Sequence, residues 1–507
     1  MQKLLIYLVF TTLTCGTLSA SAQVSEDITN DPLFNQAIVD QASGDHKSAI
    51  KILRKDLKTA ANNRFSIVAA LVKSLKATSQ WDEAFQMLSR EIEKSPFNGE
   101  FKLLLSQTRY EHGDLEKGLE QVEFAERLMT SDPKVLRLKA LLLQGLNRHT
   151  DALVAFTKIL ELNKTSADAL ILRAKSYSAL GEPAKAYEDL KSAYDNRPYD
   201  EVIVGLYLQS ALAIQKYPEV KKVAQKCIEQ FPNNYVCRES LANAFFEKKE
   251  YQQAISNFKV SLALNPKNMQ SRLRLAEASG YFGDSKESDR QFNALLTLSP
   301  DNEAGIRSWA KFLYKRNDNA EAGKQLSLFN KNNPKNLWAA VELTKMLSLV
   351  GQQSQAIAVI ENCVKGSRTD AGYLFLANIY DHFNKTADAV SALKDIREPS
   401  VWRNFDLGVA YFKLEKMDRA ISEWSKIEPA SPIYFKAQVN IASAYTRKGE
   451  FQKATDVLSK MEVPESQKSV VTDELSILAE KSREPAAEKS KTPHPLQPYL
   501  DWELPTL

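Results

Sequence analysis

Residue types that usually carry catalysis are sparse in this sequence of 507 residues. The sequence contains no HExxH motif, no glycine-rich phosphate loop and no GxSxG elbow around a serine nucleophile. The five histidines include no pair at a helical spacing that could hold a metal ion; they are His46, His112, His149, His382 and His494. We therefore expect no catalytic, cofactor-binding or metal-binding residues, and we predict that the protein is not an enzyme.

The composition is that of a folded, soluble chain. Apolar residues make up 44% of the sequence and charged residues 26%, which excludes a disordered protein. The formal net charge is only +4, and no block of like charges indicates a nucleic-acid tail or a polybasic membrane arm. Two tripeptides that begin at Asn163 and Asn384 match the N-glycosylation pattern, but such triplets arise by chance.

The first 22 residues have the pattern of a secretory signal peptide. Lys3 precedes an apolar run over residues 4–13, and Ala20-Ser21-Ala22 offers a cleavage site after Ala22. The run is too short to span a bilayer comfortably, and no later segment is long and apolar enough. We expect an exported, periplasmic protein. Acylation of Cys15, as in a bacterial lipoprotein, is an alternative, but the residues before Cys15 match such a signal poorly.

The elements that carry the remaining residues repeat every 34 residues. The unit 167–200 contains Ala174, Gly181, Ala186 and Pro198. Corresponding residues recur without gaps in five further units, which are 201–234, 235–268, 269–302, 303–336 and 337–370. A period of this kind indicates a stack of one repeated structural unit.

Each unit is predicted to be two helices joined by a tight turn. Apolar residues recur at three- and four-residue steps on two short segments, and a glycine such as Gly181 or Gly351 lies between them. A proline such as Pro198 then ends the second helix. One helix pair cannot bury its own apolar face, so stacked pairs should form a continuous core.

These residues resemble the tetratricopeptide repeat, and the resemblance extends over nearly the whole chain after residue 22. Weaker units begin near Asn30, Phe65, Gly99 and Pro133, and later units contain Ala377, Gly408 and Ala442. The resemblance implies a right-handed, all-α solenoid of about thirteen repeats over residues 23–462. The first and third repeats depart from the pattern, because Asp40 and Gly118 stand where an aromatic residue and an alanine are expected.

The resemblance also implies a protein–protein interaction scaffold that binds other proteins or peptides along a concave groove. By analogy with exported arrays of this family, we expect the partners to be envelope components. Two alternatives remain open: a subunit of an exopolysaccharide export or outer-membrane assembly machine, with possible polysaccharide contact, and a chaperone-like holder of exported clients. RNA binding is disfavoured by the predicted export and the small net charge.

Two sets of residues are candidates for binding or stabilisation. The spacing of Cys227 and Cys237 places them on neighbouring predicted helices, so they could form a disulfide; alternatively Cys227, like Cys363, is a small buried residue. The family offsets place twelve residues on the groove, which are Arg307, Lys311, Tyr314, Trp338, Val341, Lys345, Leu374, Asn378, Trp402, Phe405, Val409 and Phe412. Some of these rings could instead pack in the core.

The C-terminal region differs from the repeats. Residues 463–483 are predicted to form a capping helix that covers the last repeat, and residues 484–507 are predicted to be a disordered tail. The tail nevertheless contains an apolar motif of Tyr499, Leu500, Trp502 and Leu504. We expect this motif to dock onto a partner or onto the protein's own groove, where its acidic residues could meet Arg307 and Lys311; a frayed terminus is the alternative.

Overall fold

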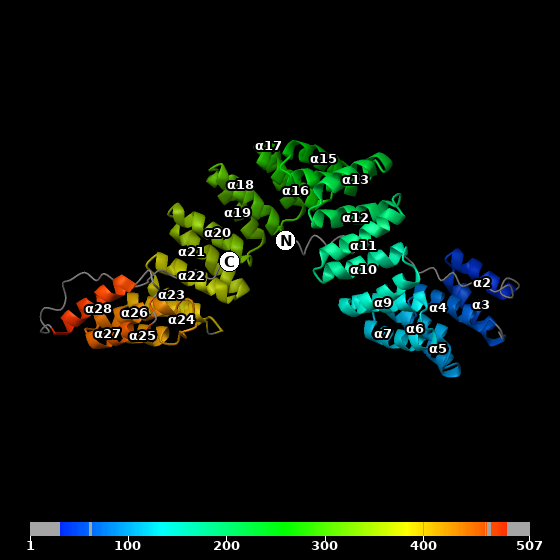
Figure 1. The fold of residues 1–507 in the computed structure, drawn as a ribbon, viewed down its shortest axis with the longest axis horizontal. Coiled ribbons are helices and arrows are strands. Elements are labelled where there is room, and N and C mark those ends of the chain that lie inside the picture. The colour runs from blue at the N-terminus through cyan, green and yellow to red at the C-terminus, as the bar shows by residue number, and fades with distance from the viewer. Residues whose placement is uncertain (1–30, 60–62, 399, 462, 464–467, 484–507) are drawn as a thin grey trace. The chain divides into compact units, whose positions relative to one another are not determined.

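The computed structural model describes residues 31–59, 63–398, 400–461, 463 and 468–483. These residues contain 27 helices and no strand (Figure 1). The all-α fold predicted from the repeats is therefore confirmed. The expected signal peptide, Cys15 and the C-terminal tail motif lie outside the described residues.

The chain divides into two compact units, residues 1–283 and 284–507. The helices of unit 1 are α2 (Pro32–Ala42), α3 (His46–Thr59), α4 (Arg64–Ala77), α5 (Trp81–Lys94), α6 (Gly99–His112), α7 (Leu115–Leu128), α8 (Pro133–Gly145), α9 (His149–Leu162), α10 (Ala167–Ala179), α11 (Pro183–Asn196), α12 (Glu201–Ala213), α13 (Tyr217–Gln230), α14 (Tyr235–Glu247), α15 (Tyr251–Leu264) and α16 (Met269–Phe282).

The helices of unit 2 are α17 (Ser285–Leu298), α18 (Glu303–Lys315), α19 (Asn319–Asn332), α20 (Leu337–Leu349), α21 (Gln353–Ser367), α22 (Asp370–His382), α23 (Thr386–Lys394), α24 (Val401–Lys413), α25 (Met417–Trp424), α26 (Tyr434–Arg447), α27 (Phe451–Lys460) and α28 (Lys468–Arg483). In chain order the described helices form thirteen pairs followed by α28, which agrees with the thirteen predicted repeats. We call the first helix of each pair an A helix and the second a B helix. Within each unit, helices chiefly contact their neighbours in sequence, as in a solenoid.

Capping residues with a 34-residue spacing start the A helices. Their side-chain oxygens accept hydrogen bonds from backbone N–H groups of the first helical turn, which would otherwise lack partners. The eight residues that begin α6 to α20 in this way are Asn98, Asp132, Ser166, Asp200, Asn234, Asn268, Asn302 and Asn336. This regular capping is a local reason why the repeats keep their length.

The turns between A and B helices also keep the period. Gly181 has a left-handed backbone with φ of 76°, and Gln215, one repeat later, has φ of 62°. The turn thus requires a residue with a left-handed backbone in every repeat, but this residue is glycine in only some of the repeats. At the other end of the pair, α11 ends at Asn196 and α13 at Gln230, each two residues before a proline, as predicted.

Residues that the repeat pattern shares form the core. The small residues Ala174 and Ala186 are buried, as are the larger Phe258 and Leu326. Gly118 occupies the position of an expected alanine, and an added Cβ there would lie 2.9 Å from Leu142 Cδ2, so Leu142 would have to shift.

The regular period breaks in the second half of unit 2. The B helices α23 and α25 have only nine and eight residues, and α24 begins at Val401, 31 residues after α22 begins at Asp370. Every residue of α24 from Asn404 to Phe412 is buried. Helix α28 packs against α27 and buries Val471 and Leu478.

Candidate protein-interaction surface

The structure corrects the predicted groove residues. Five of the twelve are buried in hydrophobic core and cannot contact a partner: Val341, Leu374, Phe405, Val409 and Phe412. Val341, Leu374 and Phe405 share one offset in the repeat, and neighbouring helices cover an apolar side chain there. Arg307 occupies the same offset as Val341 but is exposed, because a long charged side chain can reach past its neighbours to water.

The N-terminal part of the predicted groove remains accessible. Arg307 and Lys311 are exposed on α18. Tyr314 lies on the same side of this helix, three residues after Lys311, and is half-buried. The opposite side of α18 is buried through Ile306 and Leu313. The helix therefore has one face in the core and one face of cations and a phenol ring.

Helix α20 extends this face. Trp338 is half-buried, and the Arg307 guanidinium carbon lies 4.3 Å from the centre of its ring. Such a cation–π contact orients both groups. Lys345 is exposed on the same helix, seven residues or two turns further on. We call Arg307, Lys311, Tyr314, Trp338 and Lys345 the α18–α20 patch.

The cations of the α18–α20 patch are weakly held. Arg307 Nη2 lies 2.6 Å from Glu303 Oε1, and Lys345 Nζ lies 3.0 Å from Glu342 Oε1. Both cations are exposed, and ion pairs of an exposed cation with a residue on the same helix contribute about 0–1 kcal/mol. Lys311 forms no ion pair within the described part of the chain.

The ring of Tyr314 gives the patch an unsatisfied polar atom. Its hydroxyl oxygen is buried and has no hydrogen-bond partner among the described residues. Burial, with the Glu342 carboxylate nearby, raises the pKa of Tyr314 to about 12, so the hydroxyl is neutral and can donate. Three cations, a phenol ring and an indole together suit a peptide that carries carboxylates and apolar side chains.

The two other predicted groove residues do not extend the patch. Asn378 on α22 and Trp402 on α24 are half-buried, and Trp402 packs against the buried cluster that contains Phe405. The apolar residues predicted for the groove on these two helices lie in the core; they are Leu374, Phe405, Val409 and Phe412. The accessible surface in this series therefore ends at α20.

An uncharged slot in unit 2 was not predicted from the sequence. It has a volume of about 590 Å³ and lies between the B helices α19 and α21, with α20 as its floor. Small residues open it, including Gly323 and Ala358, and Met346 and Val350 line its base and rim. None of its lining residues is charged. Small residues at contact positions also occur in ordinary helix packing, so the sequence carried no distinct signal for the slot.

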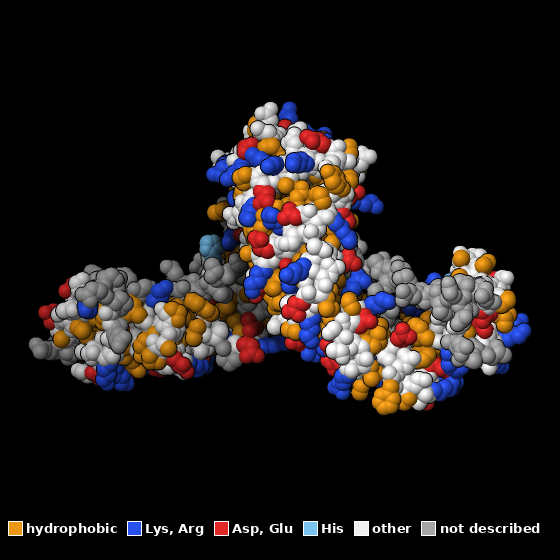
Figure 2. Space-filling view, turned by 45° about the vertical axis from the view of Figure 1, so that its right-hand side comes forward, with side chains coloured by type: hydrophobic (Ala, Val, Ile, Leu, Met, Phe, Trp, Pro, Cys, Tyr) orange, Lys and Arg blue, Asp and Glu red, His pale blue; other side chains and the backbone are white. Residues whose placement is uncertain are grey.

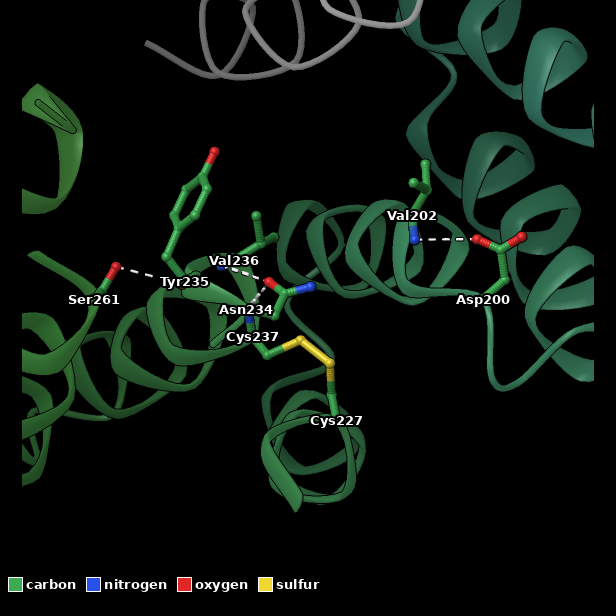
Figure 3. The surroundings of a disulfide bond; sticks show 8 residues. All are labelled: Asp200, Val202, Cys227, Asn234, Tyr235, Val236, Cys237 and Ser261. Atoms are coloured by element: carbon green, nitrogen blue, oxygen red, sulfur yellow. Dashed lines mark hydrogen bonds between the residues drawn. A yellow bond between two sulfur atoms is a disulfide. The ribbon is translucent and has the colours of Figure 1, made fainter. Parts of the chain in front are cut away.

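The paired cysteines lie at the junction of two hairpins in unit 1. Cys227 near the end of α13 and Cys237 in the first turn of α14 are bonded through sulfur, with their Cα atoms 6.0 Å apart (Figure 3). Asn234 caps the same helical turn through hydrogen bonds from the backbone N–H groups of Val236 and Cys237. Cys363 is a free, buried thiol, and burial raises its pKa.

Unit 1 contains a half-buried cation that sequence analysis did not single out. Lys175 on α10 makes no ion pair among the described residues, and burial lowers its pKa. Burial also lowers the pKa of His149, and the positive charge of Lys175 lowers it further. His149 Nδ1 is buried without a hydrogen-bond partner in the described structure. A neutral imidazole therefore lies near a single positive charge.

Other features concern charge, metals and membranes. On the face shown in Figure 2, basic and acidic side chains are interspersed and neither sign dominates. Within the described ranges, no three histidine, cysteine or acidic side chains cluster in a way that could hold a metal ion. None of the helices described is both long and apolar enough to span a bilayer.

Comparison with known proteins agrees with the repeat architecture. Residues 137–201 match the tetratricopeptide repeat family. No curated protein matches the chain. Among solved structures, the Cut9–Hcn1 assembly of APC/C is 14% identical, covers 89% of this chain and 90% of its own, and has a TM-score of 0.39.

Two further structures are similarly distant. The C-terminal part of a TPR repeat-containing protein from Cytophaga hutchinsonii is 15% identical, covers 48% of this chain and 98% of its own, and has a TM-score of 0.41. Yeast Tom70 is 14% identical, covers 79% of this chain and 97% of its own, and has a TM-score of 0.36. These distant likenesses say nothing about function. The family match covers residues 137–201, and the described residues on either side continue the same pattern of helical hairpins.

Proposed function

We propose that the protein is a non-enzymatic scaffold that binds a protein or peptide at the α18–α20 patch. The family match supports binding of proteins or peptides in general. The observation that carries the specific proposal is the exposed stripe of Arg307 and Lys311 beside the half-buried Trp338 on the next A helix. A rigid ring flanked by exchangeable cations has the composition of an interaction hot spot.

The proposed location is the cell envelope. The N-terminal sequence has the pattern of a signal peptide cleaved after Ala22. A bond between Cys227 and Cys237 is compatible with an oxidising compartment. On this proposal the mature protein begins at Gln23, and Cys15 is removed with the signal peptide. Mass analysis of the exported protein tests both points, and an acylated Cys15 would overturn them.

Site-specific crosslinking in cells tests the binding proposal. A photoreactive residue in place of Ala304, which is exposed one turn before Arg307 on α18, should capture a partner protein. The same residue in place of Lys331, exposed on the B helix α19, should not capture that partner. Equal capture at both positions would show that the partner does not recognise the patch.

Matched charge reversals then test the side chains themselves. Lys311→Glu with Lys345→Glu should lower the yield of the Ala304-position crosslink at least about fivefold. The control reverses Lys324 and Lys331, which are exposed on α19. Both double variants should retain far-UV circular dichroism, because all four lysines are exposed. An unchanged yield in the patch variant would contradict the proposal.

A further inference from the structure

We infer that the α18–α20 patch is occupied, in the absence of a partner, by residues 495–507 of the same chain. The inference rests on the proposed function of the patch and names its internal ligand. It assigns the C-terminal segment a regulatory role: the segment covers the patch and a partner must displace it.

Charge complementarity is the first argument. Residues 495–507 contain two acidic residues, Asp501 and Glu503, and no lysine or arginine. The patch contributes three cations, of which Lys311 has no ionic partner in the described structure. Arg307 and Lys345 are exposed and each pairs with a half-buried glutamate on its own helix, so either cation can also reach Asp501 or Glu503 from the solvent side.

The spacing of the charges is the second argument. Arg307 and Lys311 are four residues apart on one helix, which separates them by about 6 Å along its axis. Asp501 and Glu503 are two residues apart, which separates them by about 7 Å in an extended chain. An extended segment lying along α18 can therefore place one carboxylate beside each cation.

The apolar residues provide the third argument. In an extended chain Leu500, Trp502 and Leu504 point away from the side that carries Asp501 and Glu503. A segment that runs between α18 and α20 thus directs its carboxylates to α18 and its apolar side chains to Trp338 on α20.

The position of the segment in the chain favours binding within one molecule. The patch and α28, which ends at Arg483, both belong to unit 2. The fifteen residues 484–498 can extend over about 50 Å, which matches the five helix spacings of about 8–10 Å along the series α18, α20, α22, α24, α26 and α28. The slot between α19 and α21 is a poorer site, because its lining has no cation to meet Asp501 and Glu503.

Intramolecular photocrosslinking in the full-length protein tests the inference. A benzoylphenylalanine in place of Tyr499 should crosslink to the peptides that contain Arg307, Lys311 or Trp338, as mapped by mass spectrometry. The product should migrate as a monomer with a yield independent of protein concentration. Crosslinks to the slot residues, crosslinked dimers, or no crosslink to unit 2 would each overturn the inference.

A charge swap makes the test specific. Arg307→Glu with Lys311→Glu should lower the crosslink yield at least about fivefold, and adding Asp501→Lys with Glu503→Lys should restore it to within about twofold. The control variant Lys324→Glu with Lys331→Glu should leave the yield unchanged. Failure of the swap to restore the yield would contradict recognition through these charges.

Experiments can disprove the proposed function and this inference independently of each other. Deletion of residues 495–507 should increase partner capture at the Ala304 position, because it removes the competitor. If a partner is captured at that position but the deletion leaves its yield unchanged, the patch binds a partner and the C-terminal segment does not compete. If the Tyr499-position crosslink is found but no partner is captured, the segment occupies the patch and the proposed scaffold function is wrong.

Discussion

At the scale of single residues, buried carboxylates connect neighbouring helices of unit 1. Glu91 on α5 is buried and accepts hydrogen bonds from the guanidinium of Arg64 on α4 and from Lys94 Nζ. The bond from Arg64 outweighs desolvation and lowers the pKa of Glu91 to about 2. The pair thus joins two helices through a charge that must stay ionised.

This depressed pKa makes the contribution of Glu91 depend on pH. Glu91 stabilises the folded state fully above its ordinary pKa of 4.5, and this stabilisation is lost as the pH falls towards about 2. Glu91→Gln should therefore lower the free energy of opening of α4 and α5 by about 3 kcal/mol at pH 7, and by less at pH 3. Hydrogen exchange of the α4 and α5 amides measures the difference. Glu93→Gln on the exposed side of α5 is the control. If the difference in free energy of opening between the wild-type protein and Glu91→Gln does not become smaller at acid pH, the depressed pKa of Glu91 is contradicted.

At the scale of elements, the short helices of unit 2 rely on close packing of α24 and α25. Trp424 at the end of α25 is completely buried, and its indole lies directly against Gly408 of α24. Its Nε1–H donates to the backbone carbonyl of Phe405 at 3.0 Å, which holds the ring in place. Gly408 is therefore required by space and not by backbone conformation.

Gly408→Ala should destabilise the α24–α25 hairpin by about 1–3 kcal/mol, because the new methyl group overlaps an indole that cannot move away. Thermal unfolding followed by the loss of helical circular dichroism measures the effect. Gly323→Ala is a matched control: its nearest neighbour is the flexible end of Met346, 3.3 Å from an added Cβ, so the change should be close to neutral. Equal effects of the two substitutions would show that helix propensity, and not the indole, decides the outcome.

The disulfide links α13 and α14, which would otherwise be held together only by helix packing. Cys227 and Cys237 should both be oxidised in the native protein, and replacing them with alanine should loosen the α13–α14 junction by about 2–3 kcal/mol. Hydrogen exchange of α13 and α14 measures the change. Thiol counting on denatured, unreduced protein checks the bond itself, and two free thiols at these positions would reject it.

At the scale of the whole molecule, the contacts within each unit are mostly between successive helices. Local perturbations should therefore stay local, because a solenoid transmits stability chiefly between nearest neighbours. Gly408→Ala should increase hydrogen exchange in α24, α25 and their neighbours α23 and α26, and should leave α2–α15 of unit 1 unchanged. Increased exchange throughout unit 1 would show a cooperativity that nearest-neighbour contacts do not provide.

The sequence by itself determined the repeat, its period and the number of helix pairs. Proline and the small residues carried these features, because Pro198 cannot lie inside a helix and Ala174 marks a close helix contact. The capping residues, such as Asn234 and Asn268, also recur at this period, although their role became visible only with the helix starts. The left-handed turn residue was only partly visible, because Gln215 adopts the conformation of Gly181 with a different side chain.

Only the tertiary structure decided which groove positions are accessible. Val341 and Arg307 share one offset in the repeat, yet neighbouring helices cover the first while the second reaches solvent. Phe405 and Phe412 are core because α24 is buried continuously from Asn404 to Phe412. The slot between α19 and α21 likewise depends on how neighbouring hairpins pack. A periodic sequence specifies local helix geometry, whereas exposure depends on contacts between residues a whole repeat apart, whose side chains differ from one copy to the next.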